Sequence, residues 1–190
     1  MDRKLIISTV ALLVLVAFYF FDSSKQSSLQ NNYTKIFDFN HDSIEKVIIM
    51  NQSSAIELVR SDSLWSISGN DTLAIKQSSI DNLFNKALEV KVNTIEVSKY
   101  AKDLSIYSLD SLNGVNLILM DKSGSALSNI VLGLSAENYF SNYYREYDSN
   151  IVYRTNINVL NFLPTSPLYW GETPKIEAPE DTTSVIPSEL

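Results

Sequence analysis

The sequence predicts an α+β protein with an N-terminal transmembrane helix, followed by one domain of antiparallel sheet that packs on one main helix. Three observations lead to this prediction. An uncharged apolar run opens the chain, short apolar segments alternate with polar turns as in a meander and hairpins, and one stretch has helical periodicity. The predicted parts are a stub and anchor at residues 1–21, a linker at 22–32, an extracytoplasmic domain at 33–170 and a tail at 171–190.

Composition bounds the class of protein. Of the 190 residues, 45% are hydrophobic and 19% are charged, which is typical of a globular chain and not of a disordered one. The formal net charge of -7 argues against a nucleic-acid partner, because phosphate binding needs clustered lysine and arginine. The absence of cysteine excludes disulfides, thiolate metal sites and thiol nucleophiles.

The apolar run from Leu5 to Phe21 predicts a membrane anchor. Only Ser8 and Thr9 in it are polar, and as a helix it spans about 25 Å, close to the thickness of a hydrocarbon core. Arg3 and Lys4 precede it, so the positive-inside rule places the N-terminus in the cytoplasm and the later domain in the periplasm. We therefore expect a single-pass inner-membrane protein whose first partner is membrane lipid. The predicted anchor residues include Leu5, Val10, Leu13, Val16 and Phe20.

Two alternatives to an anchor are a cleaved signal peptide and a buried core helix. A cleavage site needs small side chains, whereas this run ends in the bulky residues Phe18, Tyr19, Phe20 and Phe21. A core helix of a globular domain normally has a polar face, and this run has none. Retention as an anchor is the interpretation that the residues favour.

The first half of the domain predicts an antiparallel meander. After the Ser-, Gln- and Asn-rich linker, the apolar cluster 36–39 could start a strand, and Val47 to Met50 forms a β-branched run that predicts another. Ile56 and Leu58, then the segment 64–67, predict two more strands joined around Ser61-Asp62-Ser63.

The clearest helix follows the meander. Ser78 and Asp81 have capping-box spacing, which predicts a helix N-terminus at Ser78. Apolar residues then recur at helical spacing and predict one stripe that packs on the sheet. These residues are Ile80, Leu83, Phe84, Ala87 and Leu88.

Two hairpins are predicted after this helix. A brief strand at 94–97 and a loop with short helical turns at 100–113 lead to the first, whose strands lie at 115–119 and 130–132 around a turn containing Gly124. The second hairpin joins 143–147 to 151–153.

The C-terminal part of the chain is predicted to form a last short helix followed by a disordered tail. Residues 156–163 predict a last short helix that Pro164 and Pro167 end. From Gly171 onward, five carboxylates against Lys175 give a net charge of -4, and three of the five prolines lie there. Such composition predicts a disordered tail.

The order of these segments resembles a known family, the bacterial domain of unknown function numbered 4340. The resemblance covers about residues 37–170. It rests on Ile56-x-Leu58-x-Arg60, Leu64-Trp65-x-Ile67, the helix from Ile80 to Leu88, Tyr107-x-Leu109-Asp110, Val115-x-Leu117, Gly124 before Ile130-x-Leu132-Gly133, and Tyr143-Tyr144-Arg145 before Val152-Tyr153-Arg154. It implies an anchored, extracytoplasmic domain encoded near ABC-type transport components related to gliding motility, without an assigned activity.

The residues offer little support for catalysis. The only histidine, His41, has no second imidazole or thiol nearby in sequence to complete a zinc site. Five scattered glycines cannot form a phosphate loop, and no nucleophile elbow is present. Asp103, Asp110 and Glu137 have no spacing that fixes an acid and base pair. We therefore predict a protein that is not an enzyme and needs no cofactor or metal.

The most unusual local feature is a concentration of aromatic residues in the second hairpin. Tyrosine rings bury much area and keep a satisfied hydroxyl, so they suit either a contact surface or cross-strand packing. The candidate interaction surface consists of Tyr139, Tyr143, Tyr144, Arg145, Tyr147 and Tyr153.

Two functions follow as hypotheses. The first is a non-enzymatic accessory subunit that presents its extracytoplasmic domain to a membrane or envelope complex, of the ABC-transporter or gliding-motility kind. The second is a periplasmic binding module for a glycan or peptide that uses the tyrosine-rich hairpin.

Overall fold

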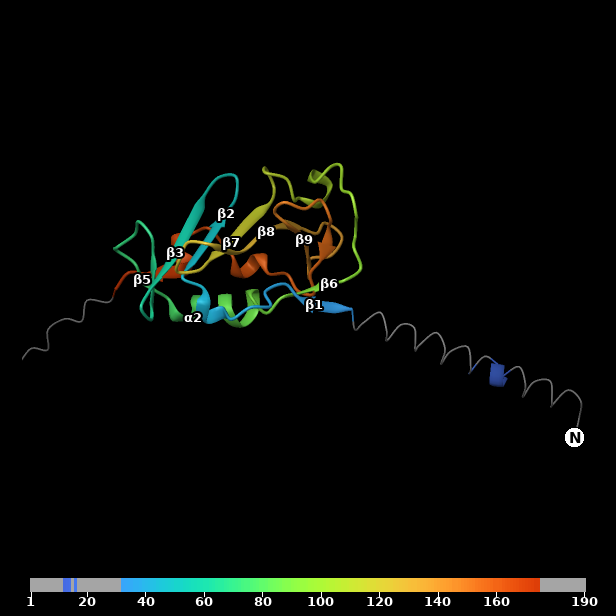
Figure 1. Ribbon diagram of the computed structural model, residues 1–190, viewed down its shortest axis with the longest axis horizontal. Helices are drawn as coiled ribbons and strands as arrows, with labels where there is room; N and C mark the ends of the chain where they lie inside the picture. Colours follow the sequence, from blue (N-terminus) through green and yellow to red (C-terminus); the bar gives the residue numbers. More distant parts are fainter. Residues whose placement is uncertain (1–11, 15, 17–31, 175–190) are drawn as a thin grey trace, which may run out of the picture.

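The centre of the molecule is a seven-stranded antiparallel sheet with strand order β10-β9-β8-β7-β2-β3-β4 (Figure 1). The computed structural model describes residues 12–14, 16 and 32–174. The strands are β2 (Lys46–Met50), β3 (Ala55–Ser61), β4 (Leu64–Ile67), β7 (Val115–Met120), β8 (Ala126–Leu134), β9 (Asn142–Glu146) and β10 (Tyr153–Arg154). The prediction of a mostly antiparallel sheet domain is confirmed.

Two meanders make up this sheet, and each runs outward from its centre. Strands β2, β3 and β4 form one, and β7 to β10 form the other. They join where β2 pairs with β7, with Val47 opposite Leu119 and Ile49 opposite Leu117. The strands of both meanders agree with the sequence prediction, whereas the long-range β2–β7 pairing has no local sequence signal.

One helix of 11 residues lies beneath the sheet in Figure 1. It begins as α2 (Gln77–Asn82) and continues as the π-helix η2 (Leu83–Ala87), where the Leu88 amide donates to the Leu83 carbonyl. The predicted apolar stripe is confirmed, since Ile80, Leu83, Ala87 and Leu88 are buried. The predicted capping box is wrong: the N-cap is Lys76, so Ser78 lies inside the first turn.

The main core fills the space between this helix and the sheet. It consists of alternate residues of the central strands, as expected for a sheet with one face packed, together with the buried helix residues and Trp170. Trp170 is fully buried at the end of α3 (Pro167–Trp170), and its indole Nε1 donates to the Pro164 carbonyl at 2.7 Å. The C-terminal segment therefore closes the core.

Two small ribbons flank the main sheet and correct three sequence predictions. Strand β1 (Tyr33–Lys35) pairs with β6 (Lys91–Asn93), so the strands lie just before the segments predicted at 36–39 and 94–97. Strand β5 (Ala74–Ile75) pairs with β11 (Gly171–Glu172). The fold thus includes two residues past the predicted boundary at Gly171. The remaining elements are the short 3-10 helices η1 (His41–Ser43), η3 (Ser105–Tyr107) and η4 (Leu160–Phe162).

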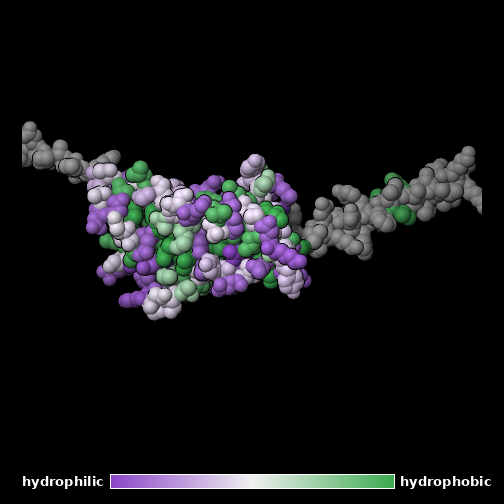
Figure 2. Space-filling model, turned by 90° about the horizontal axis from the view of Figure 1, so that it is seen from above, coloured by the Kyte–Doolittle hydropathy of each residue, from purple (hydrophilic) through white to green (hydrophobic). Residues whose placement is uncertain are grey.

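A second, smaller hydrophobic cluster lies on the opposite face of the sheet. Val131 and Tyr143 point to this face and pack against the segment that contains η3. The other buried members are Ala101, Leu109 and Val152. Gly133 permits the close approach, because a Cβ there would lie 2.1 Å from the Tyr107 carbonyl oxygen. The segment that contains η3 covers only one end of this face of the sheet. Figure 2 shows a band of apolar side chains on the same face.

The predicted anchor lies almost entirely outside the described residues. Of the positions assigned to it, Leu13 and Val16 are helical and exposed, while Leu5, Val10 and Phe20 are not described. In the part of the chain that the structure describes, no helix has the length and apolar character that crossing a membrane requires. The anchor therefore stays a prediction from the sequence.

Candidate interaction surface

The residues of the predicted tyrosine-rich surface do not form one patch. Tyr143 and Tyr144 are each only 6% exposed, and they point to opposite faces of β9. Tyr143 packs edge-on against Tyr107 in the second cluster, with 5.1 Å between ring centroids. Tyr144 packs against Tyr153 in the main core, with centroids 6.1 Å apart. Tyr144 therefore takes part in cross-strand packing, the alternative interpretation, and Tyr143 packs on η3.

Arg145 also serves the fold. Its guanidinium donates to the carbonyls of Leu109, Glu146, Tyr147 and Ser149, so it fastens the β9–β10 turn to the segment after η3. Desolvation by burial lowers the pKa of this guanidinium, although the nearby Tyr147 and Asp148 act in the opposite direction. A guanidinium with its donors aimed at backbone carbonyls has little capacity left for a ligand.

Tyr139 is the predicted member of this set that is most exposed. It and its neighbour Phe140 lie in the β8–β9 loop, with 82% and 83% of their surfaces exposed. Phe140 adds a second ring that the candidate set omitted. Two adjacent rings left in solvent are unusual, because burying such rings would gain several kcal/mol by the area rule, about 25 cal/mol per Å².

The loop that carries these two rings is held by side-chain amides. The Asn158 Nδ2 donates to the Tyr139 carbonyl at 3.0 Å, and the Phe140 amide donates to Asn138 Oδ1 at 2.9 Å. The Asn138 amide donates in turn to Ser135 Oγ at 3.2 Å. The exposure of the rings is therefore a consequence of a bonded loop conformation.

A buried polar pair holds this loop against the segment that follows β10. Asn142 is fully buried, and its Oδ1 accepts from the Val159 amide at 2.7 Å while its Nδ2 donates to the Gly133 carbonyl at 3.3 Å. The Thr155 Oγ1 accepts from the Asn142 amide at 2.7 Å. A buried amide that satisfies both its donor and its acceptor fixes one arrangement of the segments it joins.

Together these segments border a shallow hollow of about 620 Å³, which we call the aromatic hollow. Its apolar members include the half-exposed Ile157 and Phe162, and Lys86 Nζ lies 5.3 Å from the Phe162 ring centroid. Polar side chains surround the rings. The full lining is Asn85, Lys86, Glu89, Tyr139, Phe140, Asn156, Ile157, Asn158, Asn161 and Phe162.

Such a surface has the composition of a contact site. Exposed aromatic rings supply area that a partner can bury, and a rim of amides and one lysine supplies directional bonds. The sequence signal for it is the pair Tyr139-Phe140 inside a polar loop segment, where Asn138 and Ser141 flank the rings. Ile157 and Phe162 could not be assigned to it from sequence, because hydrogen bonds between residues distant in sequence, such as Val159 to Asn142 and Asn158 to Tyr139, bring them there.

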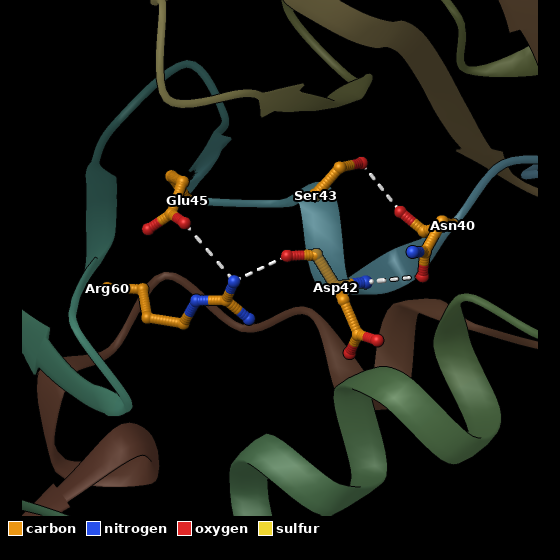
Figure 3. A network of polar contacts seen from close by, with 5 residues as sticks. All are labelled: Asn40, Asp42, Ser43, Glu45 and Arg60. Carbon is orange, nitrogen blue, oxygen red and sulfur yellow. Dashed lines mark hydrogen bonds and ion pairs between the residues drawn. The ribbon is translucent and has the colours of Figure 1, made fainter.

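A separate polar network surrounds Arg60 and is structural. Its Nη2 donates to the Asp42 carbonyl and to Glu45 Oε1, the latter at 3.2 Å, which holds η1 against β3 (Figure 3). Within η1, Ser43 Oγ donates to the Asn40 carbonyl at 2.6 Å. The adjacent His41 ring packs between Phe39 and Phe84, with centroid distances of 5.9 and 6.3 Å.

No metal centre is visible in the described ranges. Among residues 32–174 and the few described residues before them, no three or more His, Asp or Glu side chains gather closely enough to hold an ion. Asp103 is bound by Ser105, whose hydroxyl donates to it at 2.6 Å, and this bond lowers the pKa of the Asp103 carboxyl. Glu137 pairs with Arg154 at 3.3 Å.

Comparison with known proteins does not assign this chain to a family. No family model, no curated protein and no solved structure matches the chain. The resemblance to the bacterial domain family described above stays a prediction.

Proposed function

We propose that this protein is a non-enzymatic, membrane-anchored accessory subunit whose domain contacts a partner in a membrane or envelope complex. The predicted anchor is the apolar run from Leu5 to Phe21, and from Arg3 and Lys4 before it the positive-inside rule predicts a periplasmic domain at residues 33–170. An ABC-type transporter or a gliding-motility assembly is the class of complex that the family resemblance suggests.

The observation that supports this proposal most is the exposure of Tyr139 and Phe140. Aromatic residues contribute most of the binding energy in many protein interfaces, provided that they are held in position before the partner arrives. The hydrogen bonds from Asn158 and to Asn138 hold the backbone of both. The loop backbone that carries the two rings is thus fixed by bonds within the domain.

Co-purification from detergent tests the proposal. The full chain, extracted from its native membrane, should retain a partner protein, and the variant Tyr139→Ala/Phe140→Ala should lose it. Leu64→Ala is the matched control, because Leu64 is 77% exposed on β4 at the far edge of the sheet. A chain that sediments with membranes yet always migrates alone would contradict the accessory role.

A glycan-binding module is the second candidate, and one observation favours it. Asn85 and Asn161 line the same hollow as Tyr139 and Phe140. Aromatic faces with neighbouring amides suit the apolar faces and hydroxyl groups of a sugar. Retention of the full chain on envelope polysaccharide, lost in Tyr139→Ala/Phe140→Ala and kept in Leu64→Ala, would select this candidate.

A further inference from the structure

The end of the domain where the linker enters carries its own apolar strip. Strand β1 begins at Tyr33, directly after the linker, and it pairs with β6 so that Tyr33 lies opposite Asn93. The segment after β6 is yellow-green in Figure 1 and runs along this same end of the molecule. Residues 94–102 therefore lie where the chain leaves for the predicted anchor.

This segment exposes large apolar side chains. Ile95 is 49% exposed, Val97 40% and Tyr100 84%, and Tyr33 beside them is 41% exposed. Isolated exposed apolar residues are common on protein surfaces. Several exposed apolar residues on one segment are instead typical of a site that contacts a protein or a membrane.

The backbone of the segment is fixed, so the exposure is not that of an unanchored loop. The Val97 amide donates to the Val152 carbonyl at 2.7 Å, and the Val152 amide donates back to the Ser98 carbonyl at 2.8 Å. Farther along, the Ala101 amide donates to the Asn150 carbonyl at 3.0 Å. The segment thus lies alongside the residues just before β10, with Ala101 buried in the second cluster and Ile95, Val97 and Tyr100 exposed.

The charges around Tyr100 suit a phospholipid surface. Lys99 and Lys102 flank it and are exposed, Glu96 is half-buried, and Asp103 is exposed and accepts hydrogen bonds from Ser105. Tyrosine is enriched at the boundary between lipid and water, and lysine side chains reach phosphate groups from an apolar stem. Because these lysines and carboxylates balance, we expect contact with phospholipid in general and no strong selection for anionic lipid.

We infer that this strip, Tyr33, Ile95, Val97, Lys99, Tyr100 and Lys102, rests on the membrane surface and holds the domain in one orientation. The inference depends on the proposed anchoring, because the linker brings the strip to the lipid. Tethering raises the effective concentration of the bilayer, so a weak interfacial contact suffices. In this orientation the far edge of the sheet, with Leu64, points away from the membrane.

Fluorescence quenching in nanodiscs tests the inference with the full chain. The chain contains no cysteine, so single cysteines can carry an environment-sensitive label. Ser98→Cys places the label two residues from Tyr100, and Ser63→Cys places it beside Leu64 as a control in which the same single atom is exchanged. With nitroxide-labelled phospholipid, quenching at position 98 should exceed that at position 63 by at least roughly twofold.

Adding Tyr100→Ala to the Ser98→Cys chain should reduce the quenching, and Leu64→Ala should leave it unchanged. Equal quenching at positions 98 and 63, or none at either in chains that reside in the nanodisc, would overturn the inference and leave the anchoring intact. A chain that does not incorporate into nanodiscs at all would overturn both.

Discussion

The two faces of the sheet are covered in different ways. On one face, alternating residues of β2, β3, β7 and β8 pack on a helix whose apolar stripe is visible in the sequence. On the other face, the segment around η3 covers only the end formed by β8, β9 and β10. Sequence periodicity therefore reveals a face packed against a regular element, whereas a face covered by an irregular segment has no such signal.

The largest expected effect lies in the face covered by the helix. Trp170 is fully buried and its Nε1 is bonded to the Pro164 carbonyl, so Trp170→Ala leaves a cavity and an unpaired carbonyl. We expect the free energy of unfolding to fall by about 3–5 kcal/mol, measured by urea denaturation. A loss below that of ordinary surface substitutions would show that the C-terminal segment does not close this core.

A smaller effect is expected where the irregular segment meets β8. In Gly133→Ala the new Cβ would lie 2.1 Å from the Tyr107 carbonyl oxygen, so the backbone must shift, at about 1–3 kcal/mol. The control is Gly124→Ala in the β7–β8 turn, where φ is +82° and the space is open. There the left-handed backbone conformation alone costs an alanine about 1–2 kcal/mol.

Hydrogen exchange would sharpen this test. Gly133→Ala should raise exchange selectively in residues around η3, because the second cluster contains few residues and opens more easily than the main core. Uniform acceleration over both faces would mean that the two clusters unfold as one unit.

A pH dependence distinguishes the buried Tyr144 from an exposed tyrosine. Desolvation by burial, and then the charge of Glu146, raise the pKa of Tyr144 above its ordinary value of 10.0. Only the unfolded chain ionises this hydroxyl above that pH, so stability is lost as pH rises, by about 1 kcal/mol at about pH 11. Chemical denaturation across this range should show the loss in the wild-type chain, and Tyr144→Phe should reduce its slope.

The smallest effect on stability is expected in the aromatic hollow. Tyr139 and Phe140 are more than four-fifths exposed, so replacing both with alanine should change the free energy of unfolding by no more than about 0.5 kcal/mol. Thermal denaturation would check this. A loss of several kcal/mol would assign both rings to the fold and remove them from any contact surface.

Sequence reasoning predicted the local elements of this fold better than its long-range contacts. The strands of both meanders, the η3 turn segment and the helix stripe follow from period and turn residues. The β2–β7 pairing, the β5–β11 ribbon and the burial of Trp170 depend on residues distant in sequence, and no local pattern encodes them.

The candidate site was predicted in part. The density of tyrosines predicts a contact surface in the β9 region, but alternation on the strand buries Tyr143 and Tyr144 on opposite faces. Tyr139 and Phe140 stay outside because the β8–β9 loop satisfies its backbone with Asn138 and Asn158. That distinction depends on hydrogen bonds across the fold, which residue type alone does not provide.

Site-specific photo-crosslinking in intact cells tests the central claim most directly. A photoreactive phenylalanine analogue at position 140 of the full-length chain should yield one dominant adduct with a membrane or envelope protein. The same analogue at position 64, equally exposed on the far edge of the sheet, should not. Membrane-bound chains that give no adduct at position 140, or the same adducts at both positions, would contradict the account.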